Sequence, residues 1–230
     1  MCFTTFGAIF LSMAKHWWKA LAVLLVLYTI IGGFLLPVPR LQILHETIRN
    51  LYFHVTMWFG MIIILTISIV NSIRYLQTQK IKYDIVADAS SKVGLLFGIA
   101  GCINGSLWAR YTWGAWWVAD AKLNGAAISL LFYFAYQILR SSITDETNKA
   151  RIAAVYNIFA YVMFMVFIMV LPRMVASLHP GNGGNPGFGK YDLDNNMRMV
   201  FYPAILGWTL IGIWLLSISI RIKKLQIQNE

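Results

Sequence analysis

Long apolar runs alternate with short polar segments along most of this chain. A helix needs about 20 mostly apolar residues to cross the hydrocarbon of a bilayer, and six runs reach or approach that length. These predicted spans are residues 18–36, 52–73, 93–109, 125–139, 152–171 and 199–220. The pattern therefore predicts an all-α integral membrane protein, in which a bundle of six transmembrane helices forms a single domain over residues 1–230.

The composition narrows the class of protein further. Of the 230 residues, 59% are apolar and only 12% are charged, whereas a soluble domain carries about 25% charged residues. The mean hydropathy is +0.64, so polar side chains are too few to cover a water-facing globule. A soluble enzyme is therefore excluded. A disordered chain is excluded as well, because such chains are poor in apolar residues.

The third and fourth predicted spans are short and rich in glycine. Their glycines are Gly94, Gly98, Gly101, Gly105 and Gly125. Small residues let helix backbones approach closely, so we expect these two helices in the interior of the bundle. The fourth span is followed by Arg140, whose side chain we expect to snorkel toward the interface and so lengthen that span.

The formal net charge of +10 comes from basic residues that lie mainly between the apolar runs. Lys and Arg gather in the cytoplasmic loops of membrane proteins, and alternate connections place twelve of the 19 basic residues on one side. These are Lys15, Lys19, Arg74, Lys80, Lys82, Lys92, Arg140, Lys149, Arg151, Arg221, Lys223 and Lys224. We therefore expect both termini in the cytoplasm, loops 37–51, 110–124 and 172–198 outside, and no nucleic-acid partner.

Several kinds of chemistry find no support in the sequence. The two cysteines, Cys2 and Cys102, form no CxxC motif, which argues against a thiol redox pair. Hydrolase motifs are absent, and so is the phosphate-binding motif GxxxxGK[ST], so any dependence on ATP must come from a partner.

The apolar stretch before Met13 lacks the basic region of a secretory signal. Translation from Met1 and translation from Met13 are both compatible with the sequence.

A cluster of tryptophans marks the second outer loop. Trp113, Trp116 and Trp117 are spaced i, i+3 and i+4, so a helical turn would place all three rings on one face. Such an aromatic surface suits a flat polyaromatic ligand held by stacking. The alternative is an aromatic belt at the membrane interface. We expect Asp120 to cap the N-terminus of the fourth span.

Two histidines are candidates for metal ligation. His54 lies inside the second span, where an ionisable side chain is expensive and often functional, although a hydrogen bond within the bundle would also explain it. His179 opens the Gly-rich third outer loop, where simple solvation is the alternative. The predicted topology brings both to the outer face. Because neutral imidazole is a common iron ligand of haem proteins, two imidazoles there could ligate one haem iron from opposite faces.

The other histidines and the outer cations have weaker claims. His45 has the spacing of a solvated helical face with Arg49, and His16 precedes the first span on the inner side. The two propionates of a haem would need cations, for which Arg110 and Lys122, flanking the tryptophans, lead. Further outer arginines are Arg49, Arg173 and Arg198. The alternative for all of them is ordinary flanking of a span by basic residues.

The segment from Trp113 to Leu123, WGAWWVADAKL, resembles the tryptophan-rich "WWD" signature of haem-handling proteins in cytochrome c maturation. Six spans with one histidine before and one after this signature are most similar to the haem exporter protein C family. The resemblance implies that haem b binds transiently to the outer signature and that His54 and His179 are axial ligands of its iron. The implied contacts of the haem are Trp113, Gly114, Trp116, Trp117, Asp120, Lys122 and Arg110.

The resemblance also implies a place and partners. Haem would be presented on the periplasmic face of a bacterial inner membrane to a haem chaperone (CcmE-like), beside an ABC ATPase and a second membrane subunit. Three positions depart from the signature: Ala119 where Trp is frequent, Lys122 for Arg, and Asn124 for Thr. The missing ring should weaken stacking by about 1 kcal/mol, and Lys lacks the bidentate geometry of Arg toward a carboxylate.

Two other functions stay open on the sequence. A CcsA-type cytochrome c synthase (haem lyase) would form the thioether bonds itself, although this chain has no large outer domain to receive an apocytochrome. A b-type cytochrome subunit would keep both haem ligands within its spans, whereas His179 lies in a loop after Pro172. We therefore expect a haem delivery protein rather than an enzyme.

Overall fold

The computed structural model of the chain describes residues 2–179, 188–189 and 193–229, with side chains described from residue 16 onward. This part of the chain contains helices and their connections and no strand, in agreement with the predicted all-α class. Most of the Gly-rich loop expected after His179, including Gly181, Gly183, Gly184 and Gly187, lies outside the described residues, as do Lys190 and Asp192.

The helices overlap the predicted spans and are mostly longer. In chain order they are α1 (Cys2–Leu35), η1 (His45–Asn50), α2 (Leu51–Thr78), α3 (Ile81–Trp113), α4 (Ala121–Ser142), α5 (Glu146–Met165), η2 (Val166–Val170), α6 (Leu171–Met174) and α7 (Asn195–Asn229). The segments α5, η2 and α6 follow one another without a break, and η2 is a π-helical turn that precedes Pro172.

Within the described residues, five helical stretches are long and apolar enough to cross a membrane. They are His16–Leu35, His45–Thr78, Ile81–Trp113, Glu146–Met174 and Asn195–Asn229. Helix α4 is not among them: its 22 residues suffice in length, but polar side chains such as Asn124 and Gln137 dilute its apolar sequence. A multi-pass membrane protein is therefore the class that the helices indicate.

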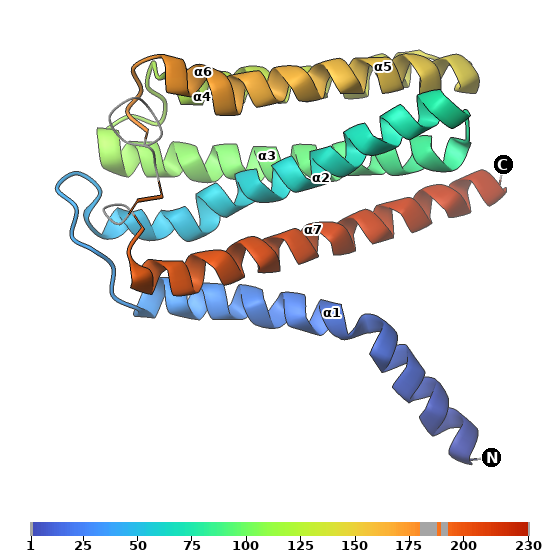
Figure 1. The fold of residues 1–230 in the computed structure, drawn as a ribbon, viewed down its shortest axis with the longest axis horizontal. Coiled ribbons are helices and arrows are strands. Elements are labelled where there is room, and N and C mark those ends of the chain that lie inside the picture. The colour runs from blue at the N-terminus through green and yellow to red at the C-terminus, as the bar shows by residue number, and fades with distance from the viewer. Residues whose placement is uncertain (1, 180–187, 190–192, 230) are drawn as a thin grey trace.

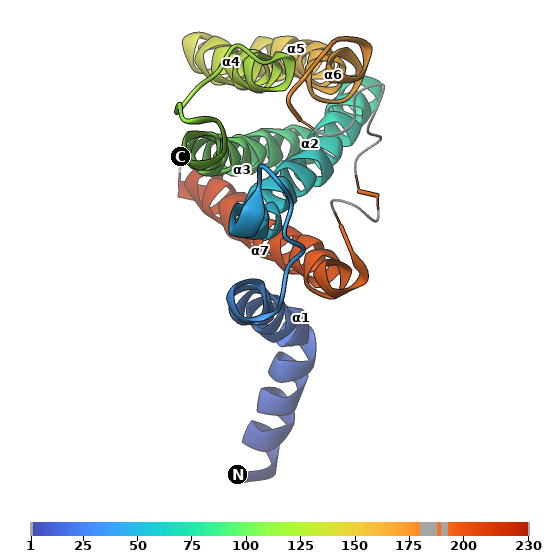
Figure 2. The same cartoon turned by 90° about the vertical axis from the view of Figure 1, so that its left-hand side faces the viewer.

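The helices stack in layers and alternate in direction (Figures 1 and 2). Helices α4 and α5–α6 form one layer, α2 and α3 the next, and α7 separates them from α1, which packs against α7. The connections α1–α2, α3–α4 and α6–α7 consequently gather at one end, which we call the loop end. The start of α1, the end of α7 and the α2–α3 and α4–α5 turns lie at the other end, the terminal end (Figure 1).

Glycines let α3 sit deep in the bundle. Helix α3 is the most buried of the five apolar stretches, as expected from its glycines. A Cβ atom on Gly94 would come within 2.5 Å of Leu65, and one on Gly98 would meet Met61 and Leu130. These contacts explain why no larger side chain stands at the two positions, since overpacking a core costs about 1–3 kcal/mol.

Buried hydrogen bonds tie three helices together inside the apolar core. Asn157 of α5 donates from Nδ2 to the hydroxyls of Ser68 and Ser72 on α2, both at 2.8 Å. Ser68 donates in turn to the carbonyl of Ala87 on α3 at 2.7 Å. Interhelical polar contacts of this kind hold membrane helices together where the hydrophobic effect between them is absent.

The expected snorkelling of Arg140 is wrong. Its guanidinium is buried at the terminal end and donates to both carboxylate oxygens of Asp84, at 2.7 and 2.5 Å. A bidentate partner on the neighbouring helix satisfies the planar fork of the guanidinium better than the interface can. The side chain therefore joins α4 to α3.

Candidate functional site at the loop end

Helix α3 ends at the first tryptophan of the cluster. Gly114 adopts φ +79°, the left-handed conformation that glycine takes most readily after a helix. The predicted helical turn carrying three tryptophans is therefore wrong: Trp113 closes α3, whereas Trp116 and Trp117 lie in the non-helical connection to α4. Their side chains are 58% and 42% exposed, so two large apolar rings face outward at the loop end.

Asp120 is the organising residue of this connection. It caps α4, as expected: its Oδ1 accepts hydrogen bonds from the backbone N–H groups of Lys122 and Leu123, at 2.9 and 3.3 Å. Its Oδ2 accepts from the backbone N–H of Leu178 at 2.7 Å and from the hydroxyl of Ser177 at 2.9 Å. The buried carboxylate of Asp120 thus links the segment after α6 to the start of α4 by hydrogen bonds.

The imidazole of His179 completes this arrangement. Its Nδ1 lies 2.9 Å from Oδ1 of Asp120, and its ring meets Trp113 edge-to-face with the centroids 5.0 Å apart. Burial lowers the pKa of His179 to about 4, with help from the Lys122 charge and against the opposing effect of Asp120. His179 is therefore a neutral imidazole at neutral pH, which is the form that binds metals.

The carboxyl of Asp120 stays ionised in this environment. Burial alone would raise its pKa, but the hydrogen bonds from Leu178 and Ser177, together with His179 and Lys122, lower the pKa below its ordinary value. An ionised carboxylate has no proton to donate, so Nδ1 of His179 must donate to it. This hydrogen bond fixes the tautomer and assigns the lone pair to Nε2.

His54 is held by α3 in a comparable way. Its Nδ1 lies 2.9 Å from the carbonyl oxygen of Gly101, which can only accept, so here too Nδ1 donates and Nε2 carries the lone pair. The half-buried ring packs edge-to-face against Trp58 and Trp108, with centroid distances of 6.4 and 5.8 Å. A Cβ atom on Gly105 would stand 2.4 Å from the imidazole, so glycine at that position makes room for the ring.

The two histidines belong to one region of the loop end. They come from α2 and from the segment after α6, which are 125 residues apart in the sequence. Both rings nevertheless pack against the C-terminal end of α3, His54 against Trp108 and His179 against Trp113. The backbone N–H of Lys122 bonds to Asp120, the partner of His179. The fold therefore brings five of the predicted site residues to the loop end of α3 and the start of α4: His54, His179, Trp113, Asp120 and Lys122.

Two of the outer arginines serve the scaffold. Arg49 donates to the carbonyl oxygens of Gly33 and Leu36, at 2.9 and 2.6 Å, and so closes the C-terminal end of α1. Arg198 donates from Nε to the carbonyl of Leu193 at 3.1 Å. These bonds direct part of each guanidinium toward the backbone of the scaffold.

Arg110 is placed differently. Its exposed guanidinium reaches over the end of α3 to the carbonyl oxygen of Gly114, directly beside the tryptophan connection. Arg173 makes a similar bond to its own helix, at the carbonyl of Met169. Arg110 therefore remains the arginine next to the signature, and Lys122 is the cation next to the histidines.

Sequence reasoning missed several residues that shape the site. Gly101 and Gly105 were interpreted as packing residues, although they face His54 directly. Trp108 packs against His54 and donates to the Thr47 hydroxyl at 3.1 Å. The i, i+4 spacing of the two glycines, which places both on one face of α3, was the available signal.

Taken together, the fold and the site define a class: an all-α, multi-pass membrane protein with two oriented imidazoles, a buried carboxylate and exposed tryptophans at one end of its bundle. The family model described as Heme exporter protein C matches residues 4–230. The chain belongs to that family.

Individual relatives agree with this membership over part of the chain. Heme exporter protein C of Bradyrhizobium diazoefficiens is 29% identical over 143 residues, which cover 62% of this chain and 53% of the relative. The Escherichia coli K12 protein of the same name is 25% identical over 146 residues, or 62% and 54%. Cytochrome c biogenesis protein CcsA of Prochlorococcus marinus is 36% identical over 87 residues, 38% of this chain and 28% of its own. The aligned region thus spans about half the length of the exporter relatives.

Proposed function

We propose that this chain binds haem at the loop end and delivers it for cytochrome c maturation. His54 and His179 are the axial ligands of the iron in this proposal, and Trp113, Gly114, Trp116, Trp117, Asp120, Lys122 and Arg110 surround the macrocycle and its propionates. The haem is cargo, bound as haem b and passed on, and the chain acts as a carrier rather than as an enzyme.

The observation that carries the proposal is the hydrogen-bonding pattern that the two imidazoles share. Each donates its Nδ1–H to a fixed oxygen, the Gly101 carbonyl for His54 and the Asp120 carboxylate for His179. Histidines that ligate metals through one ring nitrogen use a hydrogen bond from the other to fix the tautomer and orientation of the ring and to raise its basicity. Two histidines from distant segments, both prepared in this way, are what a bis-imidazole site requires.

The surrounding residues also suit haem. Trp116 and Trp117 are exposed at the loop end, where aromatic rings can stack on a macrocycle. Lys122 and Arg110 supply positive charge beside the tryptophans for the propionates. Within the described residues no group of three or more His, Cys, Asp or Glu side chains could hold a bare metal ion, so an iron that arrives inside a macrocycle fits the donor set better.

We further propose six membrane crossings with both termini in the cytoplasm. Helix α4 is the sixth: at 1.5 Å per residue its 22 residues span about 33 Å, enough for a hydrocarbon core of about 30 Å. An even number of crossings agrees with the placement of the start of α1 and the end of α7 at one end (Figure 1). The excess of basic residues on that side makes it cytoplasmic, and the loop end is then periplasmic, at the inner membrane of a bacterium.

The partners follow from this placement and from the family. A carrier needs an acceptor for its cargo, and we propose a periplasmic haem chaperone (CcmE-like) that takes haem at the loop end. Because the chain has no nucleotide-binding motif, the energy of an ABC-type haem export assembly would come from an ATPase and a second membrane subunit.

The test is haem transfer to the chaperone in membranes that contain the wild-type chain, His54→Ala, His179→Ala or the double variant. His45→Ala is the matched control, because His45 is exposed in η1 at the same end. We expect haem-stained chaperone with wild type and H45A and none with the other variants, at equal insertion by immunoblot. Normal loading by the double variant would refute the proposal.

The partial similarity to CcsA favours one second candidate, a cytochrome c synthase. Incubating the purified chain with haem and an apocytochrome, without any chaperone, distinguishes the two functions. Covalent cytochrome c in that reaction would establish the synthase. Haem that stays on the chain until a chaperone is added would establish the carrier.

A further inference from the structure

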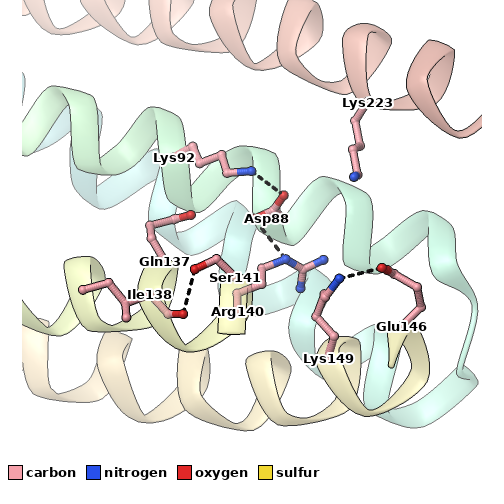
Figure 3. A pocket seen from close by; sticks show the side chains of 9 residues that line it. All are labelled: Asp88, Lys92, Gln137, Ile138, Arg140, Ser141, Glu146, Lys149 and Lys223. Atoms are coloured by element: carbon pink, nitrogen blue, oxygen red, sulfur yellow. Dashed lines mark hydrogen bonds and ion pairs between the residues drawn. The ribbon is translucent and has the colours of Figure 1, made fainter. Parts of the chain in front are cut away.

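The terminal end holds a second polar site, far from the histidines. A cavity of about 490 Å³ opens between α3, α4, the start of α5 and the end of α7. Six charged side chains line it (Figure 3): Asp88, Lys92, Arg140, Glu146, Lys149 and Lys223. Such a concentration of charge beside lipid-facing helices is costly unless it serves a purpose.

Ion pairs account for most of these charges. Arg140 pairs with Asp84 and, from Nε, with Asp88 at 3.2 Å. Lys92 pairs with the other oxygen of Asp88 at 2.8 Å and is 54% exposed. Lys149, with a 20% exposed side chain, pairs with Glu146 at 2.5 Å.

One positive charge is left over. Counting Asp84 behind Arg140, four cations face three carboxylates. The surplus falls at Lys223, which points from α7 toward the cavity (Figure 3) and makes no hydrogen bond or ion pair within the described residues. The surplus positive charge at the mouth of the cavity therefore favours the binding of an anion.

An apolar groove continues directly from this cavity. It lies between α3 and α7, encloses about 290 Å³ and shares Lys92 with the charged cavity. Apart from Lys92 and Ser219 its walls are aliphatic: Val93, Leu96, Leu215, Ile218 and Ile222. From Ile222 to Leu215 it follows α7 for about 10 Å toward the middle of the bundle.

We propose that the charged cavity and the groove together bind an anionic phospholipid. The phosphate lies between Lys92 and Lys223, and one acyl chain lies along the groove. Basic pockets between transmembrane helices on the cytoplasmic side are where anionic headgroups bind, and the twelve basic residues predict this side for the terminal end. The lipid joins α3 to α7 at the end where Lys223 has no carboxylate of its own. The assignment does not depend on haem binding.

The test is native mass spectrometry of the full chain released from nanodiscs of dioleoyl phosphatidylglycerol or dioleoyl phosphatidylcholine. The variant Lys92→Gln, Lys223→Gln removes both phosphate contacts. The control Lys80→Gln, Lys224→Gln removes the same charge at neighbouring positions that do not line the cavity. We expect wild type and control to retain one phosphatidylglycerol, and the first variant to retain it roughly thirty-fold less, as for two cations withdrawn from an anionic headgroup.

A second pair of variants tests the groove. Ile218→Trp fills it, whereas Leu131→Trp adds the same ring to an exposed position on α4. We expect I218W to release the lipid and L131W to keep it. Equal retention by both double variants, or equal retention of phosphatidylcholine, would overturn the proposal. Displacement of the lipid by millimolar glycerol 3-phosphate would assign the cavity to a soluble phosphate ester and would also overturn it.

Discussion

Nδ1 of His179 lies 2.9 Å from Oδ1 of Asp120, the carboxylate that also caps α4. A structural helix cap and the orientation of a proposed metal ligand therefore depend on the same side chain. Any change of Asp120 acts on both, and the two effects can be separated by the choice of substitution.

Asp120→Asn keeps a good helix cap but removes the negative charge next to the imidazole. We expect haem affinity to fall by roughly 10- to 100-fold, as for the loss of the hydrogen-bond partner of a ligating histidine. The amide NH2 group cannot accept the bonds that one carboxylate oxygen accepts, which costs about 1–3 kcal/mol of stability. Asp120→Ala should lose the same affinity and in addition about 1 kcal/mol of stability with the cap. Haem titration and circular dichroism melting measure the two. Wild-type haem affinity in D120N would show that the carboxylate does not support His179.

The low pKa of His179 predicts an unusual pH dependence. Because the folded-state pKa is about 4 and the unfolded value is about 6.5, the unfolded chain binds more protons between these pH values. The contribution of His179 to stability is therefore complete above pH 6.5 and is lost as the pH falls toward 4.

This titration can be followed by NMR of histidine-labelled, haem-free protein. The His179 signal should stay in its neutral position at pH 5. A midpoint for His179 near 6.5 would contradict the burial that the structure describes.

Gly105→Ala should disturb His54 without unfolding the chain. The added Cβ would stand 2.4 Å from the ring, and the imidazole is the more mobile partner. We expect loss of the low-spin, bis-histidine haem spectrum at a modest cost in stability, about 1–3 kcal/mol. The control is Gly98→Ala, whose Cβ meets Leu130 and Met61 in the core. G98A should lower the melting temperature but leave the spectrum of the folded fraction unchanged.

Trp116 tests the aromatic part of the site. Its ring is 58% exposed, and the hydrogen bond at this residue goes from the Ser106 hydroxyl to its backbone carbonyl, which survives substitution. Trp116→Ala should weaken haem binding by about 1 kcal/mol, roughly five-fold, at unchanged melting temperature. Trp17→Ala, at a similarly exposed tryptophan in the middle of α1 and away from the loop end, is the control. Equal haem affinity in W116A and wild type would leave Trp116 as an interfacial residue.

Hydropathy was sufficient to find the helices but not their ends. The predicted third span began at residue 93, whereas α3 begins at Ile81. The intervening stretch contains Asp84, Asp88 and Lys92, which a hydropathy scan rejects. These residues remain helical because their charges are paired with one another and with Arg140, a partnership between separate helices that no local pattern contains.

The sequence was sufficient to select candidate residues of the site but not to predict the hydrogen bonds between them. Residue type and spacing selected His54, His179 and Asp120 as candidates. Asp120 was expected as a helix cap and, from the resemblance, as a haem contact, but not as the hydrogen-bond partner of His179. Its bonds to Ser177, Leu178 and His179 cross about 60 residues of sequence, and only the tertiary fold creates them. The helical turn across Trp116 failed because spacing alone does not reveal that Gly114 ends the helix.

The length of α3 determines how deep in the bilayer the proposed haem site lies. Its 33 residues extend about 50 Å, whereas the hydrocarbon layer is about 30 Å thick. The excess projects into the headgroup regions on the two sides. If the excess is shared equally between the two sides, Gly105, eight residues before the end of α3, lies close to the boundary between acyl chains and headgroups. A macrocycle held beside it in the proposed site would keep its apolar body at the edge of the hydrocarbon layer and turn its carboxylates to water, where they are accessible from outside the bilayer.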